Sequence, residues 1–306
     1  MKKLSFGERV VLDFKRNKQK YLIIVPVLVY FILFEYKPMY GVIIAFKEYK
    51  PVRGIAGSEW VGFKQFARFF NDIYFFRLLR NTVTISFLSL VFAFPMPILL
   101  ALLLNEVKHA KFKKTVQTIT YMPHFIAMVI LCGMITSFCS TNGIVNQIIA
   151  LFGGTKTNLL MKSSAFYPIY IISGIWKGIG WDSIVFLAAL SGIDQEQYEA
   201  ARVDGAGRIK QMWYITLPGI VPTISILLIL RLGGILSVGY EKILLLYQPI
   251  TYEVADVIST YTYRKGLLEA DYSYSTAISI FNSVVNIMFL TASNKISKKV
   301  GQSGLF

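Results

Sequence analysis

Six long apolar stretches dominate this sequence, and they restrict the folds that the chain can adopt. A helix needs about 20 largely apolar residues to cross the hydrocarbon core of a bilayer. Only 16% of the residues are charged, whereas a soluble domain carries roughly 25%. We therefore predict an all-α membrane protein with six transmembrane helices in a single domain over 1–306. The predicted spans are 21–46, 82–104, 115–139, 165–190, 219–238 and 274–291.

Lysine and arginine residues beside these stretches predict the orientation, because short cytoplasmic segments carry an excess of both. We expect a cytoplasmic lead over 1–20, a membrane core over 21–294 and a cytoplasmic tail over 295–306. The segment 47–81 argues against this orientation, because it is basic and yet would lie outside. Its aromatic residues suggest helices that lie on the membrane surface. The basic residues used are Lys2, Lys3, Arg9, Lys15, Arg16, Lys18, Lys20, Lys108, Lys111, Lys113, Lys114, Lys295, Lys298 and Lys299.

The formal net charge of +15 also bears on binding partners. A basic excess is typical of nucleic-acid-binding proteins, but those present a basic face together with a readable motif. Here the basic residues cluster beside apolar stretches, where they suit anionic lipid headgroups. We therefore expect membrane lipid, and no nucleic acid, among the partners.

The sequence lacks the residue clusters that enzymes and metal sites need. The two histidines, His109 and His124, have no partner at metal-ligand spacing. Cys132 and Cys139 lie seven residues apart in an apolar stretch, which favours packing over a disulfide or a metal site. The segment 153–157 lacks the glycine that precedes the lysine of a phosphate loop. We expect no catalytic residue, no cofactor-binding residue and no metal site in this chain.

The connection between the fourth and fifth stretches, residues 191–218, is polar and favours helix. Asp194 is a good N-cap, and Gln197 stands where a capping-box partner would. Gly205 is a natural helix stop because glycine accepts a left-handed backbone. A second short helix is expected over 206–214. The sequence thus predicts a helix, a turn and another helix at the cytoplasmic surface.

This connection resembles a known family signature. The pattern is Glu-Ala-Ala, three residues, glycine, nine residues, isoleucine, one residue and Leu-Pro. It is similar to the EAA loop of permease subunits in binding-protein-dependent type I ABC importers, which have a maltose-permease-like fold. The segments 60–63, 239–243 and 261–266 resemble the branch that takes up oligosaccharides from polysaccharide breakdown. The residues matched in the loop are Glu199, Ala200, Ala201, Gly205, Leu217 and Pro218.

The resemblance implies partners and a location. The six matched loop residues would form a coupling surface for one subunit of an ATP-binding dimer, and that dimer would bind ATP and Mg²⁺. A second permease, related but different, would form the other half of the translocation pathway. An external solute-binding protein would deliver a sugar or oligosaccharide. The chain would lie in the cytoplasmic (inner) membrane of a prokaryote, with both termini in the cytoplasm.

Charged residues inside spans are costly and are candidates for function. Lys177 and Asp182 lie in the fourth stretch, and Arg231 lies in the fifth. Trp176 and Trp181 accompany them, and aromatic faces suit the apolar faces of sugar rings. These five residues are our predicted substrate pathway. The alternative is that Lys177 pairs with an acidic residue on another helix and that the tryptophans only pack.

A different class of protein also fits a six-span chain, namely an ion-coupled secondary transporter. Ion coupling requires carboxylates within the membrane, and Asp182 and Glu35 are the residues available for it. Such a transporter commonly contains an inverted internal repeat, and we see none in the sequence. The importer permease is therefore the preferred prediction.

Overall fold

The structure is a computed structural model, and it describes residues 6–301, 304 and 305. In this part of the chain six helices are long and apolar enough to cross a membrane, which confirms the predicted fold class. Lys2 and Lys3 of the predicted lead lie outside the described residues. The six spans are Lys18–Phe46, Phe75–Glu106, Met128–Leu151, Ser163–Ser191, Arg208–Gly233 and Tyr272–Lys299.

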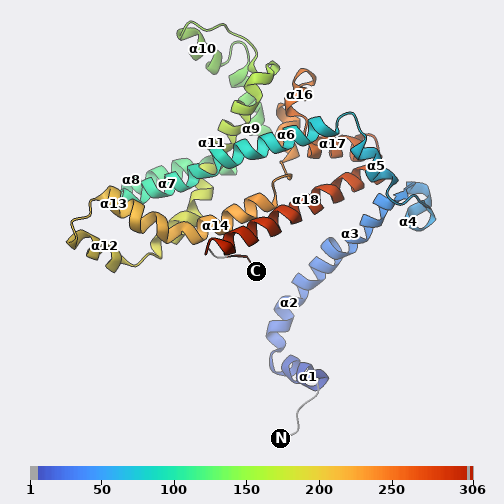
Figure 1. The fold of residues 1–306 in the computed structure, drawn as a ribbon, viewed down its shortest axis with the longest axis horizontal. Coiled ribbons are helices and arrows are strands. Elements are labelled where there is room, and N and C mark those ends of the chain that lie inside the picture. Colours follow the sequence, from blue (N-terminus) through green and yellow to red (C-terminus); the bar gives the residue numbers. More distant parts are fainter. Residues whose placement is uncertain (1–5, 302–303, 306) are drawn as a thin grey trace.

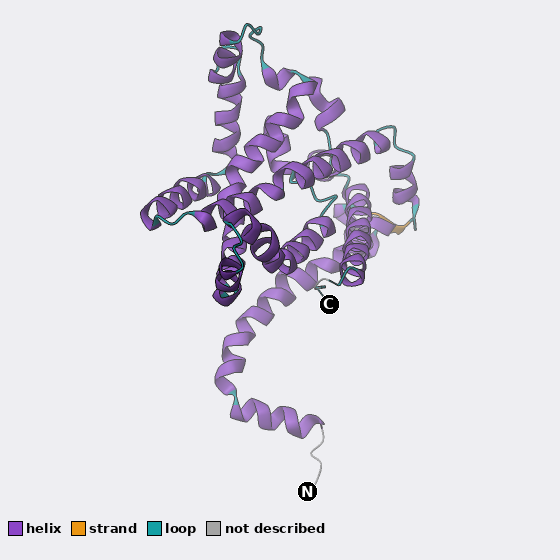
Figure 2. Cartoon of the chain, turned by 60° about the vertical axis from the view of Figure 1, so that its left-hand side comes forward, coloured by secondary structure: helices purple, strands orange, loops and turns teal. Residues whose placement is uncertain are grey.

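Most of the first span stands apart from the body of the molecule, and only its last segment packs on α18 (Figures 1 and 2). A short helix, α1 (Phe6–Arg16), precedes it. Residues 22–40 are exposed without exception, although nearly all are apolar. Other molecules must therefore cover this surface. The span is built from α2 (Lys18–Tyr30), η1 (Phe31–Tyr36), α3 (Lys37–Met39) and η2 (Tyr40–Phe46).

The segment after the first span folds into a small cap, which we call the external cap because the predicted orientation places it outside. Its strands β1 (Lys47–Glu48) and β2 (Glu59–Trp60) pair antiparallel. Its aromatic residues do not all lie at the membrane surface as expected, because Phe69 is buried against Tyr274 and Phe281. The cap also contains η3 (Pro51–Arg53), α4 (Gly54–Gly57) and α5 (Lys64–Phe70).

The third predicted span is the main departure from expectation. A continuous helix over 115–139 was predicted, but the chain forms α8 (Ala110–Tyr121), η5 (Met122–Phe125) and α9 (Met128–Cys139). Pro123 has no amide hydrogen to donate within a helix. The backbone is non-helical at Ile126 and Ala127, so the helix is interrupted between Phe125 and Met128. The second span consists of α6 (Phe75–Leu88), η4 (Ser89–Ala93) and α7 (Pro95–Glu106), and α10 (Ile144–Leu151) and η6 (Leu159–Met161) follow α9.

The second half of the chain contains the longest helices. The fourth span, α11 (Ser163–Ser191), is one continuous helix despite Pro168. The fifth ends at Gly233, earlier than predicted. The remaining elements are α12 (Gln195–Val203), α13 (Arg208–Gln211), η7 (Met212–Thr216), α14 (Leu217–Gly233), α15 (Tyr240–Leu246), η8 (Pro249–Thr251), α16 (Tyr252–Ala255), α17 (Ile258–Tyr263), η9 (Arg264–Leu268) and α18 (Tyr272–Lys299).

Buried apolar side chains form separate clusters along the bundle. The outer cluster ties α5 and α6 to α18. The inner cluster joins α7, α11 and α14 beside the α12–α13 connection. That connection and the external cap lie at opposite ends of the molecule (Figure 1), as expected for opposite membrane faces. The inner cluster consists of Ala101, Phe186, Leu190 and Ile220.

Candidate functional site

The connection 191–218 adopts the predicted helix, turn and helix. The Asp194 carboxylate caps α12 by accepting a hydrogen bond from the Glu196 amide at 3.0 Å. Gly205 has a φ of 75°, the left-handed conformation that ends α12. The Ala206 amide then donates to the Ala201 carbonyl at 2.8 Å, which closes the helix end. Local sequence chemistry thus shapes this surface.

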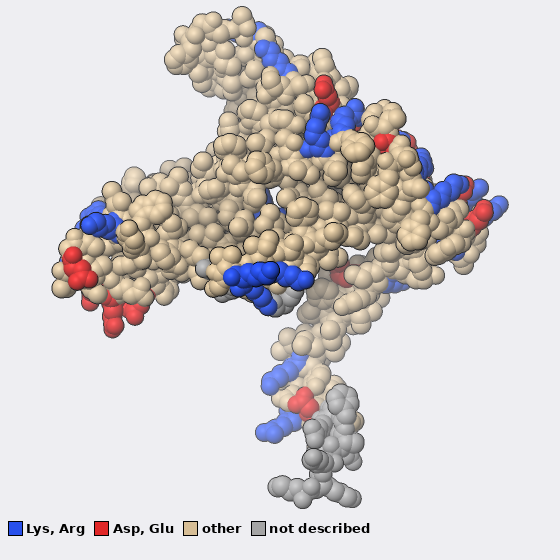
Figure 3. All heavy atoms as spheres, in the orientation of Figure 1, with Lys and Arg blue, Asp and Glu red and all other residues tan. Residues whose placement is uncertain are grey.

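The outer side of this connection is open and mixed in chemistry. Glu199 and Ala200 are exposed, and Ala201 is half-buried. Large apolar side chains are exposed beside them, including Val203 at 88%. Acidic side chains gather at this end of the molecule (left in Figure 3). Small, acidic and apolar side chains together suit contact with another protein. Leu217 is half-buried against the inner cluster, and Pro218 is exposed.

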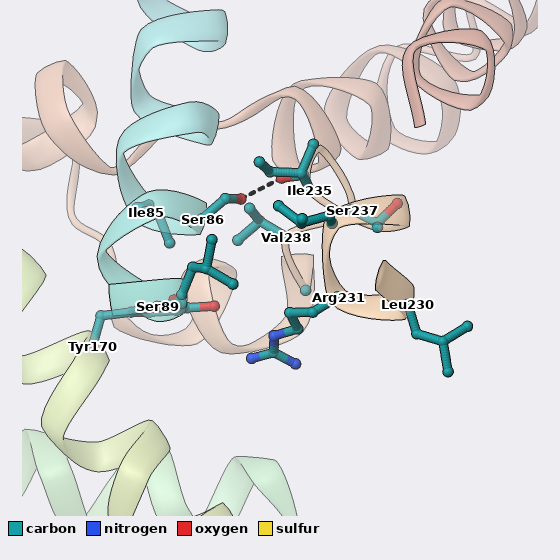
Figure 4. A pocket seen from close by; sticks show the side chains of 13 residues that line it. Ile85, Ser86, Ser89, Tyr170, Leu230, Arg231, Ile235, Ser237 and Val238 are labelled. Carbon is teal, nitrogen blue, oxygen red and sulfur yellow. Dashed lines mark hydrogen bonds between the residues drawn. The ribbon is translucent and has the colours of Figure 1, made fainter. Parts of the chain in front are cut away.

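A cavity of about 600 Å³ lies among the second, fourth and fifth spans. It joins a smaller cavity of about 320 Å³, with which it shares Ser89, Tyr170 and Arg231 (Figure 4). Ser86 donates a hydrogen bond to the Ile235 carbonyl at the edge of the smaller cavity. The charged side chains that line the larger cavity are Lys177, Asp182, Arg231 and Lys242.

Lys177 joins the fourth span to the broken third span. Its ammonium donates to the His124 carbonyl at 2.8 Å and to the Ile126 carbonyl at 2.5 Å. The break at Pro123 leaves these carbonyls without helical partners, and the lysine satisfies them. Lys177 therefore binds another helix through backbone carbonyls and not through an acidic residue, and it also lines the cavity.

Lys242 is a cavity residue that sequence reasoning missed. It lies in α15 and is only 7% exposed. Its ammonium donates to the Tyr170 carbonyl at 2.7 Å and lies 4.4 Å from the Tyr170 ring centre. The available signal was its place in the segment 239–243, which resembles oligosaccharide permeases. Because α15 is not a predicted span, its lysine was not counted as a charge within the membrane.

Arg231 is the least restrained cation of the cavity. It extends from the C-terminal end of α14 and faces Tyr170 across the smaller cavity (Figure 4). Among the described residues, no carboxylate lies within ion-pair distance of it. Asp182 is the one acidic side chain that lines the larger cavity. The cavity therefore carries more positive than negative charge.

The two predicted tryptophans lie in different places. Trp181 stacks on the His124 ring with centroids 4.4 Å apart, and His124 lines the cavity. Trp176 instead lines an apolar groove of about 510 Å³ between α9 and α11. The structure thus brings Lys177, Asp182 and Arg231 to one cavity and places Trp176 on another face of α11.

The segment 261–266 helps to hold the outer ends of the spans together. Tyr261 and Tyr274 donate hydrogen bonds to the Asp72 carboxylate at 2.5 and 2.6 Å. Burial raises the pKa of Asp72, but these hydrogen bonds and one from the Tyr74 amide outweigh it and hold the pKa below its ordinary value. Nearby, Arg264 forms a bidentate pair with the fully buried Asp256 at 2.6 and 2.8 Å.

These features define a class, namely a multi-pass permease that exposes a Glu-Ala-Ala helix and encloses a polar cavity among its spans. Residues 66–301 match the family described as "Binding-protein-dependent transport system inner membrane component". The chain belongs to this family, and it is a permease of the inner membrane that is not itself catalytic.

Two relatives from Bacillus subtilis (strain 168) are similar over nearly their whole length. The "Polygalacturonan/rhamnogalacturonan transport system permease protein YteP" is 45% identical over 300 residues, with 98% of this chain and 94% of YteP covered. "Protein LplB" is 48% identical over 293 residues, with 95% and 92% covered.

Solved structures give the same fold. The chain resembles a subunit in the "Crystal structure of a bacterial ABC transporter involved in the import of the acidic polysaccharide alginate". The TM-score is 0.89 at 48% identity, and the alignment covers 96% of this chain and 100% of that subunit. A second structure of a bacterial alginate ABC transporter, in complex with an "alginate pentasaccharide-bound periplasmic protein", matches with a TM-score of 0.89 and 47% identity, over 97% of this chain and 100% of that subunit.

Proposed function

We propose that this chain forms half of the translocation pathway of an ATP-driven importer for acidic oligosaccharides. The excess of positive charge around one cavity among the spans carries this proposal. The comparisons support it, since one relative is named for polygalacturonan and rhamnogalacturonan transport and a similar solved structure is of a transporter that imports the acidic polysaccharide alginate.

The three cations have different parts in this proposal. Lys177 and Lys242 are held by backbone carbonyls, so their ammonium groups have fixed positions. Arg231 has no such restraint and is free to pair with a carboxylate of the sugar through two parallel hydrogen bonds. A pathway needs attraction that is weak enough for release. Asp182 lowers the net charge and would help the sugar to leave.

The exposed first span supports a second permease as partner. Residues 22–40 are apolar and exposed, and they stand away from the rest of the chain (Figure 2). Lipid alone would suffice to cover a single helix, but a half-pathway also needs a facing subunit to enclose it. We propose a related permease for this role, together with an external solute-binding protein that delivers the sugar.

We propose that two ATP-binding subunits take part, one of which binds the exposed surface of α12 and the adjacent turn while the other binds the second permease. They would hold ATP and Mg²⁺, and their closure would switch the spans between inward-facing and outward-facing states. The proposed contact residues are Glu199, Ala200, Ala201, Gly205, Leu217 and Pro218. Because two spans follow this connection and four precede it, both termini share its side of the membrane, which we assign to the cytoplasm.

The test is uptake into proteoliposomes that contain the chain with the permease and ATP-binding subunits that copurify with it. We expect ATP-dependent uptake of a galacturonate trisaccharide from its binding protein, and much weaker uptake of a neutral trisaccharide. Equal uptake of both would contradict an acidic substrate. Uptake that follows an ion gradient and ignores ATP would indicate a secondary transporter instead.

A further inference from the structure

We propose that Tyr198 is a positioning residue that links the coupling helix α12 to the fifth span through a hydrogen bond with Thr216. The inference rests on the proposed function and adds the route by which movement of α12 reaches the membrane. Its basis is a contact between residues on either side of the turn at Gly205. The Tyr198 hydroxyl lies 3.0 Å from the Thr216 hydroxyl oxygen.

The direction of this hydrogen bond follows from its neighbours. The Thr216 hydroxyl also lies 3.3 Å from the Gln211 carbonyl, which accepts hydrogen bonds but cannot donate them. Both hydrogen bonds can form together when Thr216 donates to the Gln211 carbonyl and Tyr198 donates to Thr216. Thr216 is only 1% exposed, so its oxygen has no access to water as a substitute partner.

Tyr198 and Glu199 leave α12 in different directions, because neighbouring residues of an α-helix point about 100° apart. Glu199 is exposed on the side proposed to meet the ATP-binding subunit, whereas Tyr198 is half-buried and reaches Thr216. Thr216 is the last residue of η7 and directly precedes α14. Short π-helical segments of this kind occur frequently at functional sites. The hydrogen bond thus connects the partner-facing helix to the residue that directly precedes α14 within the fifth span.

Two further contacts join the same elements. The Gln211 side chain donates to the Ala206 carbonyl at 2.7 Å, which ties the turn to the second helix. Ile193, just before α12, packs on Gly219, where an added Cβ would lie 2.7 Å from its terminal methyl group. Apolar packing of this kind resists separation but has no preferred direction. The Tyr198 hydrogen bond is directional and opposes rotation of α12 against α14.

This arrangement decides how the connection moves. The turn at Gly205 is a natural place for bending, and a free hinge there would absorb displacement of α12. With Tyr198 bound to Thr216, the two sides of the turn move together. A push on α12 is then passed to α14, which carries Arg231 at its far end.

The experiment uses the complete importer in lipid nanodiscs and proteoliposomes. Tyr198→Phe and Thr216→Val each remove one hydroxyl at nearly constant shape, whereas Thr216→Ser keeps it. Tyr214→Phe is the matched control, because Tyr214 is 80% exposed on the same connection. The readouts are recovery of the ATP-binding subunits and the galacturonate trisaccharide imported per ATP hydrolysed.

A third readout does not depend on which sugar is imported. Gly239 lines the smaller cavity, and a side chain built there meets no atom within 4 Å. The variant Gly239→Cys therefore reports opening of the cavity through its labelling by a membrane-impermeant maleimide. Labelling is compared with and without ATP plus vanadate.

We expect Tyr198→Phe and Thr216→Val to lower import per ATP, and the ATP-dependent change in labelling, by about 2- to 10-fold. Thr216→Ser and Tyr214→Phe should stay near wild type, and the double variant should be no worse than either single one. If Tyr198→Phe imports as much sugar per ATP as the wild type, the inference is wrong. It is also wrong if import falls only in proportion to a reduced recovery of the ATP-binding subunits.

The wild-type protein separates failure of this inference from failure of the proposed function. If Gly239→Cys shows ATP-dependent labelling but the importer takes up no trisaccharide, the proposed substrate is wrong. The role of Tyr198 can then still be tested by the labelling readout. A wild-type complex with neither ATP-binding subunits nor ATP-dependent labelling would overturn both proposals.

Discussion

Replacement of Arg231 by glutamine tests the proposed selectivity of the cavity. Of the described cations that line the cavity, Arg231 is the one that no backbone carbonyl holds, and glutamine replaces it with a neutral polar side chain that is shorter. Because Lys177 and Lys242 remain bonded to their carbonyls, the cavity walls should stay in place. The change therefore isolates one positive charge.

The size of the effect follows from the setting of Arg231. A hydrogen bond to a charged group contributes about 1.5–3 kcal/mol, and exposure to a water-filled cavity reduces this toward the value for surface pairs. Arg231 is exposed to the cavity, so we take about 1–2 kcal/mol, which corresponds to about 5- to 30-fold in transport efficiency for an acidic sugar. A neutral sugar of equal length gains nothing from the charge and should be little affected.

The assay compares uptake of galacturonate and neutral trisaccharides in proteoliposomes over a range of salt concentrations. Arg231→Lys should be intermediate, since it keeps the charge and loses the bidentate geometry. Lys156→Gln is the control, because it removes one exposed positive charge outside the cavity. An equal loss of both sugars in Arg231→Gln would refute the reasoning and would indicate that Arg231 supports the fold.

Other predictions concern coupling, packing and pH. Glu199→Ala should weaken recovery of the ATP-binding subunits in pull-downs from detergent while the chain still inserts; unchanged recovery would count against the coupling surface. Gly180→Leu should destabilise the protein by about 1–3 kcal/mol in thermal unfolding, because the new side chain meets the Thr120 carbonyl; unchanged stability would contradict this close packing. The pKa of Asp72 is lowered in the fold, so the ionised Asp72 carboxylate should stabilise the folded protein above about pH 4. This contribution should disappear as pH falls below that value. Tyr261→Phe should weaken that dependence, and an identical pH profile would exclude the hydrogen bond as its cause.

The sequence predicted local features of the coupling connection well. Asp194 caps a helix and Gly205 ends one because each acts on its own backbone neighbours. The break in the third span was harder to predict. Pro123 interrupts helices but is also tolerated inside them, and what decides here is whether another group satisfies the freed carbonyls. Lys177 does so, from a helix some fifty residues away in sequence.

The cavity was only partly predictable. Charge within a span identified Lys177, Asp182 and Arg231, and the structure places all three on one cavity. Lys242 escaped this criterion because α15 is too short to cross a membrane. Trp176 was included as an aromatic neighbour of these charged residues, yet its side chain lines a different groove. Which face of a helix meets a cavity depends on how the helices pack. A span that is apolar on every side carries no sequence pattern that identifies this face.

The sequence by itself determined that the chain crosses a membrane and exposes a Glu-Ala-Ala helix, because span length, helix capping and a contiguous motif are local properties. Only the tertiary structure decided which charges share a cavity and that Tyr198 reaches Thr216 across the turn. Those arrangements depend on the packing of helices that are distant in sequence. Burial then gives these contacts their strength, because groups withdrawn from water keep the partners that the fold supplies.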